Sequence, residues 1–231
     1  MTRKWVNVLR HGILSMCLVL MSSAAFAEIE SDLSEATQST IPPPKLKVSS
    51  WLLMDASTGL TLAAQRADTP VEPASLTKLM TAYVVFREIE RGTVKLDDVV
   101  LVSEKAWRSE GSRMFIEAGD KVQIKNLLMG LIVQSGNDSA VALAEHIAGS
   151  EEGFVDLMNQ TAAELGMANS HFVNSAGMPH PDHYTTARDV TLLTRAIIDQ
   201  QPDHYAMYAI REFTWNDITQ KNRNPLLGRD S

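Results

Sequence analysis

The segment that most constrains the fold begins at Ser75 and ends near Gly92, and its apolar residues recur at helical spacing on most sides of the helix. These residues are Leu76, Leu79, Met80, Tyr83, Val84, Phe86 and Ile89. A helix without a polar face is enclosed by protein rather than laid on a surface. With 231 residues, of which 45% are hydrophobic, the chain is long enough to enclose it in one domain with an ordinary core.

Further helices and a few strands are predicted around this central helix. Apolar spacing predicts helices over residues 124–133, 138–148, 151–165 and 187–199. Strands are expected over 48–55 and 60–64, joined by a turn at residues 57–59, over the short apolar run 99–102, and over 211–218. Residues 174–184 are predicted to form a loop. The pattern is that of an α/β (α+β) fold in which the hairpin over 48–64 needs further strands to pair with.

The first 27 residues predict export. A basic start with Arg3, Lys4 and Arg10 precedes an apolar run over 13–21 and the sequence Ala25-Phe26-Ala27, which is typical of a signal peptide cleaved after Ala27. The apolar run is shorter than the roughly 20 residues that a membrane span needs. We therefore expect a periplasmic protein whose residues 28–45 form a disordered polar lead. The net charge of −7 argues against binding nucleic acid.

Ser75 and Lys78 are the first pair of residues that suggests chemistry. Three positions apart at the start of a helix, they share one face, with Cβ atoms about 5–6 Å apart. A serine hydroxyl needs a base to remove its proton, and an apolar environment lowers the pKa of a lysine so that it can serve as that base. At ordinary residue frequencies, however, a Ser-x-x-Lys pattern occurs by chance in about half of all chains of this size. The pair alone does not establish a site.

Ser135, Gly136 and Asn137 form a second candidate set between two predicted helices. Ser135 can relay a proton, and the Asn137 amide can bind a peptide group of a substrate. The alternative is a plain helix cap, because Ser and Asn are favoured at helix N-termini. Asp138 is placed to interact with the dipole of the helix that follows.

The two sets together resemble a known catalytic arrangement. Residues 72–80 (Glu-Pro-Ala-Ser-Leu-Thr-Lys-Leu-Met) and 134–138 (Gln-Ser-Gly-Asn-Asp) resemble the first two active-site motifs of low-molecular-mass penicillin-binding proteins, the serine-type D-alanyl-D-alanine carboxypeptidases of peptidase family S11. Residues 50–59, 172–189, 213–216 and 222–224 resemble other parts of that family, so the resemblance covers about residues 46–227. It implies the penicillin-binding-protein/β-lactamase-like transpeptidase fold, with a helical cluster against an antiparallel sheet.

The resemblance also implies an activity and roles for the candidate residues. The reaction is removal of the terminal D-Ala from peptidoglycan stem peptides through an acyl-enzyme on Ser75. In that reaction Lys78 deprotonates Ser75, Ser135 returns the proton to the leaving amine, and Asn137 holds the substrate amide. Penicillins and other β-lactams, which mimic the substrate, are expected to acylate Ser75 and inhibit the enzyme.

The family's third motif, Lys-Thr-Gly, does not occur in these 231 residues. We therefore expect residues 46–231 to form a partial catalytic domain with an incomplete sheet, lacking the family's all-β second domain and C-terminal membrane helix. Contact with the inner-membrane surface is expected only for a complete C-terminus. Residues 28–231 alone are predicted to be largely inactive and poorly folded.

Two other functions are compatible with parts of the pattern. A class A β-lactamase shares the Ser and Lys but needs a deacylating Glu, for which Glu164 is the nearest candidate, and it typically carries Asp where this chain has Gly136. A non-catalytic or inactive truncated homologue that only binds peptidoglycan is the other alternative. Labelling by a fluorescent penicillin separates catalysis from binding alone, because only an activated Ser75 is acylated.

The histidines do not suggest a metal site. His180 and His183 lie three positions apart with Asp182 between them, but the chain has neither an H-x-x-x-H nor an H-E-x-x-H pattern. A loop is the better interpretation of this segment, and the sequence predicts neither a metal nor a cofactor.

Overall fold

The computed structural model describes residues 45–228, so the predicted signal peptide and all but the last residue of the polar lead lie outside the described residues. The described chain falls into two units. One contains residues 45–47 and 53–63, and the other contains residues 48–52 and 64–228. The predicted N-terminal hairpin is present, with β1 (Trp51–Met54) paired to β2 (Thr61–Gln65).

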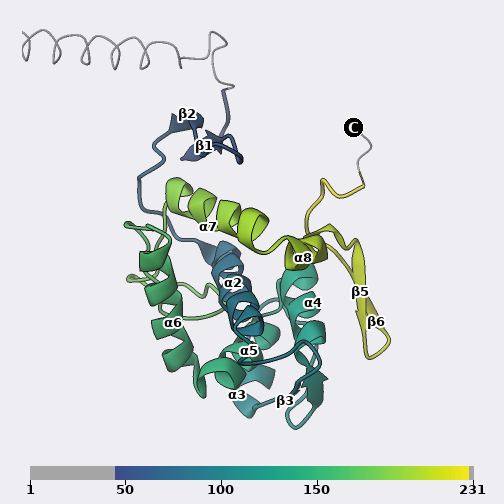
Figure 1. The fold of residues 1–231 in the computed structure, drawn as a ribbon. Helices are drawn as coiled ribbons and strands as arrows, with labels where there is room; N and C mark the ends of the chain where they lie inside the picture. The colour runs from purple at the N-terminus through teal and green to yellow at the C-terminus, as the bar shows by residue number, and fades with distance from the viewer. Residues whose placement is uncertain (1–44, 229–231) are drawn as a thin grey trace, which may run out of the picture. The chain divides into compact units, whose positions relative to one another are not determined.

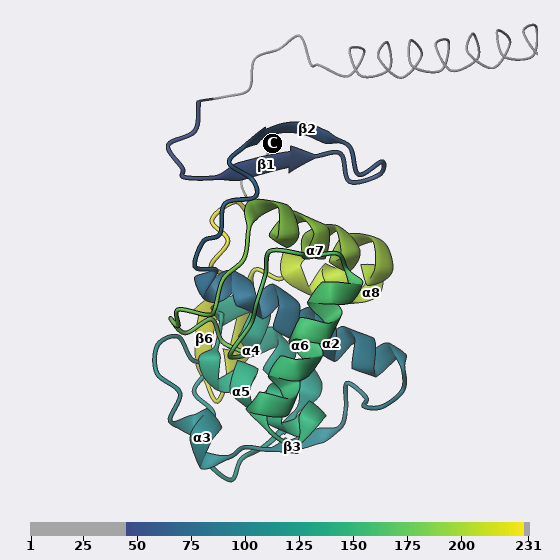
Figure 2. The ribbon, with the colours of Figure 1, turned by 90° about the vertical axis from the view of Figure 1, so that its left-hand side faces the viewer.

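The larger unit is built around the central helix that the sequence predicts. This helix, α2 (Thr77–Glu90), follows a short 3₁₀ helix, η1 (Ala74–Leu76). Four helices contact it: α4 (Ile124–Gln134), α5 (Asn137–Ala148), α6 (Glu151–Glu164) and α7 (Ala187–Gln200). Figure 1 shows α2 between α6 on one side and α4 on the other, and in Figure 2, viewed from the side of α6, α6 crosses in front of α2. The predicted helices are confirmed, with ends that differ by one or two residues.

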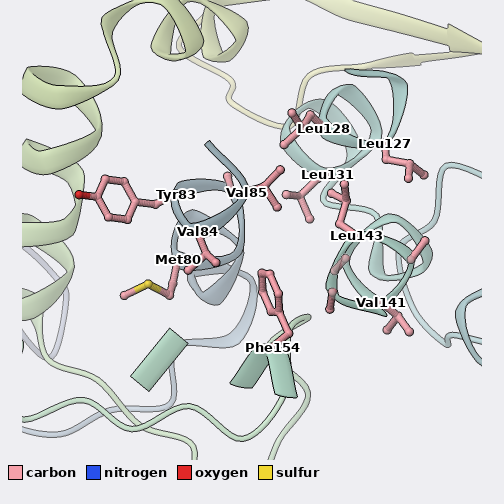
Figure 3. Close-up of a cluster of buried hydrophobic side chains, with 14 of the residues drawn as sticks. Met80, Tyr83, Val84, Val85, Leu127, Leu128, Leu131, Val141, Leu143 and Phe154 are labelled. Carbon is pink, nitrogen blue, oxygen red and sulfur yellow. The ribbon is translucent and has the colours of Figure 1, made fainter. Parts of the chain in front are cut away.

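The core of this unit explains why α2 has no polar face. Its side chains meet the inner faces of α4, α5 and α6, as Figure 3 shows for the cluster around Val85, Leu131 and Phe154. Phe154 and Val85 have no exposed surface, and Leu131 is 2% exposed. Truncating a fully buried aromatic side chain such as Phe154 to alanine costs about 3–5 kcal/mol of folding free energy. Burial of this kind fixes the ends of α2, α4 and α5 relative to one another.

The strands of the larger unit form two short antiparallel ladders. β3 (Val99–Leu101) pairs with β4 (Lys121–Gln123), with Val100 opposite Val122. β5 (Glu212–Trp215) pairs with β6 (Ile218–Lys221), with Phe213 opposite Gln220. The apolar run over 99–102 predicts β3, but the sequence does not predict β4, because Val122 is its only apolar residue and it carries no alternating pattern.

The prediction of a single strand over residues 211–218 is wrong. Asn216 and Asp217 both have positive φ, 45° and 61°, and they form the turn between β5 and β6. A two-residue hairpin turn of this kind favours Asn and Asp at its centre, so the pair is a turn signal inside the expected strand. The sequence also does not predict three short helices: α3 (Glu104–Trp107), α8 (Pro202–Tyr205) and η2 (Ala206–Ala209).

Two features of the fold bring distant segments to the N-terminal end of α2. The backbone of Val71 pairs with Thr185, and that of His171 pairs with Tyr184, so residues 171–185 return beside the segment that leads into η1. The β5–β6 hairpin lies against α4, where the Gln134 side chain donates to the Lys221 carbonyl over 2.6 Å. Within residues 45–228, the helices lack the combined length and apolar character that crossing a bilayer requires.

Candidate active site

Ser75 lies in η1, exposed at the start of the buried helix α2. The residue before it, Ala74, has a left-handed backbone with φ 45°. This conformation costs a residue with a side chain about 1–2 kcal/mol, so surrounding contacts must hold it in place. The segment that leads to Ser75 is therefore kept in a conformation that local preference alone does not favour.

Lys78 is buried three residues later, with 5% of its surface exposed. Its Nζ donates a hydrogen bond of 2.5 Å to the carbonyl oxygen of Ala176. Burial, and secondarily the positive charge of Arg223, lower the pKa of Lys78 to about 8, while Asp138 acts in the opposite direction. About one tenth of the lysine is then neutral at pH 7, against less than one in a thousand for a free lysine. A neutral amine is what a general base for a serine requires.

Ser135 joins this pair in one cavity. The cavity has a volume of about 200 Å³, and Ser75, Lys78 and Ser135 line it together with apolar side chains that include Leu79 and Leu131. Ser135 ends α4 in a left-handed conformation, with φ 58°, and within residues 45–228 its buried Oγ has no hydrogen-bond partner. This hydroxyl is therefore free to exchange a proton with a group that enters the cavity.

Asn137 is not among the residues lining that cavity, although it follows Ser135 by two positions. It lines a neighbouring cavity of about 240 Å³ together with Ala176, whose carbonyl holds Lys78. Its Nδ2 donates to the Glu110 carbonyl over 2.6 Å, which leaves Oδ1 as the group that can accept an N–H from a ligand. The helix-cap interpretation of Ser135 and Asn137 is wrong, because the N-cap of α5 is Gly136 and no side chain caps it.

Gly136 and Asp138 explain how this turn is held. A Cβ on Gly136 would lie 2.8 Å from Asp138 Oδ1 and 2.9 Å from Ser139 Oγ, so no larger residue fits without displacement. The fully buried Asp138 carboxylate accepts N–H groups from Met114 (3.0 Å), Phe115 (2.9 Å), Ile116 (3.3 Å) and Ser139 (2.8 Å). The sequence predicts only an interaction of Asp138 with the helix dipole. In the structure the carboxylate also anchors the backbone of residues 114–116.

Residues 173–178, which we call the lysine loop, place the acceptor of Lys78. Asn174 Oδ1 accepts the N–H groups of Gly177 (2.7 Å), Met178 (2.9 Å) and Ala176 (3.3 Å). Glu151 accepts both the N–H and the Oγ–H of Ser175. Sequence reasoning did not identify Ala176, because the group that contacts Lys78 is a backbone carbonyl, which leaves no signature in residue type.

Arg223 is the other residue near Lys78 that sequence reasoning did not single out. Its backbone N–H donates to the Val133 carbonyl over 3.2 Å, just after β6, so the hairpin β5–β6 carries its charge toward α4. The resemblance over residues 222–224 was a signal for it.

The histidine segment is also explained by the fold. His180 and Asp182 lie 3.9 Å apart, but both ring nitrogens of His183 are engaged elsewhere, with Thr77 and with the Val173 N–H. Among residues 45–228 there is no group of three or more His, Cys, Asp or Glu side chains that could hold a metal ion. Glu164 forms a 2.7 Å ion pair with Arg87 and does not line the Ser75 cavity.

Comparison with known proteins shows the family to which the chain belongs. The sequence profile of the D-alanyl-D-alanine carboxypeptidases, peptidase family S11, matches residues 36–231. The chain belongs to this family. Its sequence is 41% identical over 214 residues to D-alanyl-D-alanine carboxypeptidase DacC of Escherichia coli, covering 90% of this chain and 54% of that protein. It is 44% identical over 191 residues to DacD of the same organism, covering 80% and 49%.

Solved structures of the family share the fold. Penicillin binding protein 5 of Haemophilus influenzae matches with a TM-score of 0.79 at 39% identity, over 81% of this chain and 55% of that one. Penicillin binding protein 6B of Escherichia coli matches with the same TM-score at 44% identity, over 82% and 62%. The expected penicillin-binding-protein fold is confirmed. The chain spans about half the length of the curated relatives that it matches.

Proposed function

We propose that this chain carries the acylation centre of a serine D-Ala–D-Ala carboxypeptidase that acts on peptidoglycan stem peptides. One observation carries the proposal: a buried lysine whose pKa is lowered to about 8 lines the same cavity as an exposed serine at a helix start. The family membership gives the substrate class, because the relatives are named D-alanyl-D-alanine carboxypeptidases. The absence of Lys-Thr-Gly from the 231 residues limits the proposal to the steps that Ser75, Lys78, Ser135 and Asn137 perform.

The first step is formation of an acyl-enzyme. Neutral Lys78 removes the proton from Ser75 Oγ, and the oxygen attacks the carbonyl carbon of the penultimate D-Ala. The tetrahedral intermediate collapses when the C–N bond to the terminal D-Ala breaks, and the proton passes from Lys78 through Ser135 to the departing nitrogen. Water then attacks the ester carbonyl while Lys78 takes its proton, and as the bond to Ser75 breaks Lys78 returns that proton to Ser75 Oγ, which releases the shortened peptide and restores the enzyme.

Asn137 holds the substrate in this scheme. Because its Nδ2 is committed to the Glu110 carbonyl, its Oδ1 is the atom that accepts an N–H from the substrate backbone. A penicillin presents a strained amide carbonyl to Ser75 in place of the peptide bond, so the same attack opens its ring and leaves an acyl-enzyme. β-Lactams are therefore proposed as inhibitors.

Release of D-Ala tests the activity. The protein expressed from its complete gene is incubated with a peptide ending in D-Ala–D-Ala, and free D-Ala is measured. Ser75→Ala should abolish release, and Lys78→Ala should lower it by about 10²–10⁴-fold, as for loss of a general base. Ser57→Ala is the serine control and should retain full activity, because Ser57 lies in the exposed turn between β1 and β2 and lines neither the Ser75 cavity nor the Asn137 cavity. Full release by Ser75→Ala would refute the proposal.

The same experiment separates the alternatives. Binding of the peptide without release of D-Ala would favour a non-catalytic peptidoglycan-binding protein. Rapid hydrolysis of penicillin with loss of activity in Glu164→Gln would favour a class A β-lactamase.

The periplasm is the location that we propose, since the substrate lies there and residues 1–27 have the pattern of a cleaved signal peptide. Mass spectrometry of the envelope fraction should find Glu28 as the first residue. A cytoplasmic product that retains Met1 would contradict this location.

A further inference from the structure

His183 is a buried titratable side chain that the proposed reaction does not use. It is 2% exposed, and its ring packs edge-on against Phe172 with the centroids 5.7 Å apart. Nδ1 lies 3.0 Å from the Val173 N–H, which can only donate, so Nδ1 is the acceptor. The ring proton is therefore on Nε2, which donates to Thr77 Oγ1 over 2.8 Å. Burial lowers the pKa of His183 to about 4, which keeps the ring in this neutral form at physiological pH.

The two hydrogen-bond partners of His183 lie on the two segments that surround the Lys78 side chain: the start of α2 and the lysine loop. Thr77 is the first residue of α2 and lies directly before Lys78. Val173 begins the lysine loop, whose Ala176 carbonyl accepts the hydrogen bond from Lys78 Nζ. The imidazole thus connects the start of α2, which carries Lys78, to the loop whose Ala176 carbonyl accepts the hydrogen bond from Lys78 Nζ.

A second hydrogen bond also joins α2 to the lysine loop. Thr81, one turn further along α2, donates through Oγ1 to the Ser175 carbonyl over 2.6 Å. Lys78 and Thr81 therefore contact consecutive carbonyls of the lysine loop from one face of α2. His183 holds the lysine loop at Val173 and Thr81 holds it at Ser175, so the loop has little freedom to move away from Lys78.

We propose that His183 is a positioning residue for Lys78: by joining Thr77 to Val173 it holds the Ala176 carbonyl against Nζ and keeps water out of the lysine's surroundings. The expected effect of His183 on the acylation rate rests on the proposed function, whereas its expected effect on the pKa of Lys78 does not. Loss of the imidazole loosens the loop, admits water to Nζ and thereby raises the pKa of Lys78 toward its ordinary value.

The electrostatic surroundings are compatible with this mechanism. The charged groups that act on Lys78 are Asp138, on α5, and Arg223, after β6, and neither contacts His183. The groups that act on His183 are His171 and His180, both on its own segment. Substitution of His183 therefore leaves the charges that face Lys78 in place, and a changed lysine pKa reports a change in solvation and hydrogen bonding.

The expected size follows from the fraction of neutral lysine. If the pKa rises by one unit from about 8, the neutral fraction at pH 7 falls about tenfold, and the acylation rate falls with it. Above the new pKa the rates of variant and wild type converge. A general loss of structure would instead lower the rate at every pH.

The test compares three variants in the protein expressed from its complete gene. His183→Ala removes both contacts. His183→Gln keeps an N–H donor at the ε position toward Thr77, and Asn159→Ala is the structural control, because Asn159 makes two bonds to Phe172 (2.8 and 2.9 Å) and none to Thr77. The readouts are the pH dependence of acylation by a fluorescent penicillin and the titration of Lys78 Cε by ¹³C NMR, assigned with Lys78→Arg.

His183→Ala should shift both midpoints upward by about one pH unit, with acylation about tenfold slower at pH 7 and nearly unchanged near pH 10. His183→Gln, which keeps only the donor toward Thr77, should shift the midpoints less than His183→Ala, and Asn159→Ala should lower Tm without moving either midpoint. An unchanged Lys78 midpoint in His183→Ala would overturn the inference.

Two further outcomes are informative. If His183→Ala does not fold, Thr77→Val, which removes only the acceptor hydroxyl, replaces it and should shift the midpoint in the same direction; no shift would again overturn the inference. A wild-type protein that folds but is never acylated would contradict the proposed function, while the NMR titration of Lys78 would still decide the role of His183.

Discussion

Substitution of Gly177 tests whether the lysine loop must lie where the structure places it. Gly177 has φ 85°, and a Cβ there would overlap the carbonyl carbon and oxygen of Ala74 and lie 2.9 Å from Thr77 Oγ1. Because backbone atoms cannot rotate away, Gly177→Ala must move the loop. The left-handed backbone costs about 1–2 kcal/mol, and overpacking adds about 1–3 kcal/mol, so we expect a loss of about 2–5 kcal/mol in the free energy of unfolding.

Gly119→Ala is the matched control for this variant. Gly119 has φ 88°, but a Cβ on it would have nothing within 4 Å. Gly119→Ala should therefore lower the free energy of unfolding only by the cost of the left-handed backbone, about 1–2 kcal/mol. The melting temperatures of the two variants should differ by about 2–4 °C for each kcal/mol of the difference.

Acylation by a fluorescent penicillin gives the second readout. A displacement of about 1 Å in the position of a catalytic group costs about 10²-fold in rate, so Gly177→Ala should acylate about a hundredfold more slowly, while Gly119→Ala should match the wild type. If Gly177→Ala melts and acylates like Gly119→Ala, the close approach of the loop to Ala74 and its support of Lys78 are both refuted.

Other predictions follow from the same contacts. The acylation rate should rise about tenfold from pH 7 to pH 9 with a midpoint near pH 8, because the neutral form of Lys78 is the base; a rate independent of pH over this range would contradict it. Arg223→Gln removes a positive charge and should raise the pKa of Lys78, which a shift of the same midpoint to higher pH would show. Asp138→Asn places an amide N–H donor opposite backbone N–H groups and should lower the free energy of unfolding by about 1–3 kcal/mol. An unchanged urea concentration at the midpoint of unfolding would contradict the anchoring role. The pKa of His183 is about 4 in the folded protein, against the ordinary histidine value of 6.5 in an unfolded chain, so the unfolded chain binds the proton more readily; stability should fall as the pH drops from about 6.5 to about 4, and this component should be missing in His183→Gln.

The helices and the shared cavity of Ser75 and Lys78 could be predicted because their signals are local. The apolar residues of α2 repeat every three or four positions, and that period specifies both a helix and its burial. Ser75 and Lys78 line one cavity because of their spacing at the start of a helix, and two apolar runs place Ser135 between α4 and α5 and Asn137 at the first position of α5. Each of these inferences needed only the geometry of neighbouring residues.

What the sequence did not reveal depends on contacts between distant segments. Ala176 acts through its carbonyl, Asp138 through four N–H groups of which three lie more than twenty residues away, and His183 through a contact across 106 positions. None of these roles is encoded in the residue's own neighbourhood. The β5–β6 turn is different: Asn216 and Asp217 are local turn formers, and the apolar residues on either side concealed them.

Whether Ser75 is a nucleophile activated by Lys78 can be decided by locating the site of penicillin acylation. The protein expressed from its complete gene is incubated with benzylpenicillin at a pH of about 8, where half of Lys78 is neutral, and its intact mass is measured before peptide mapping. We expect one added penicillin per chain, on the peptide that contains Ser75, with no addition in Ser75→Ala and much slower addition in Lys78→Ala. An adduct on another residue, or one that persists in Ser75→Ala, would contradict it.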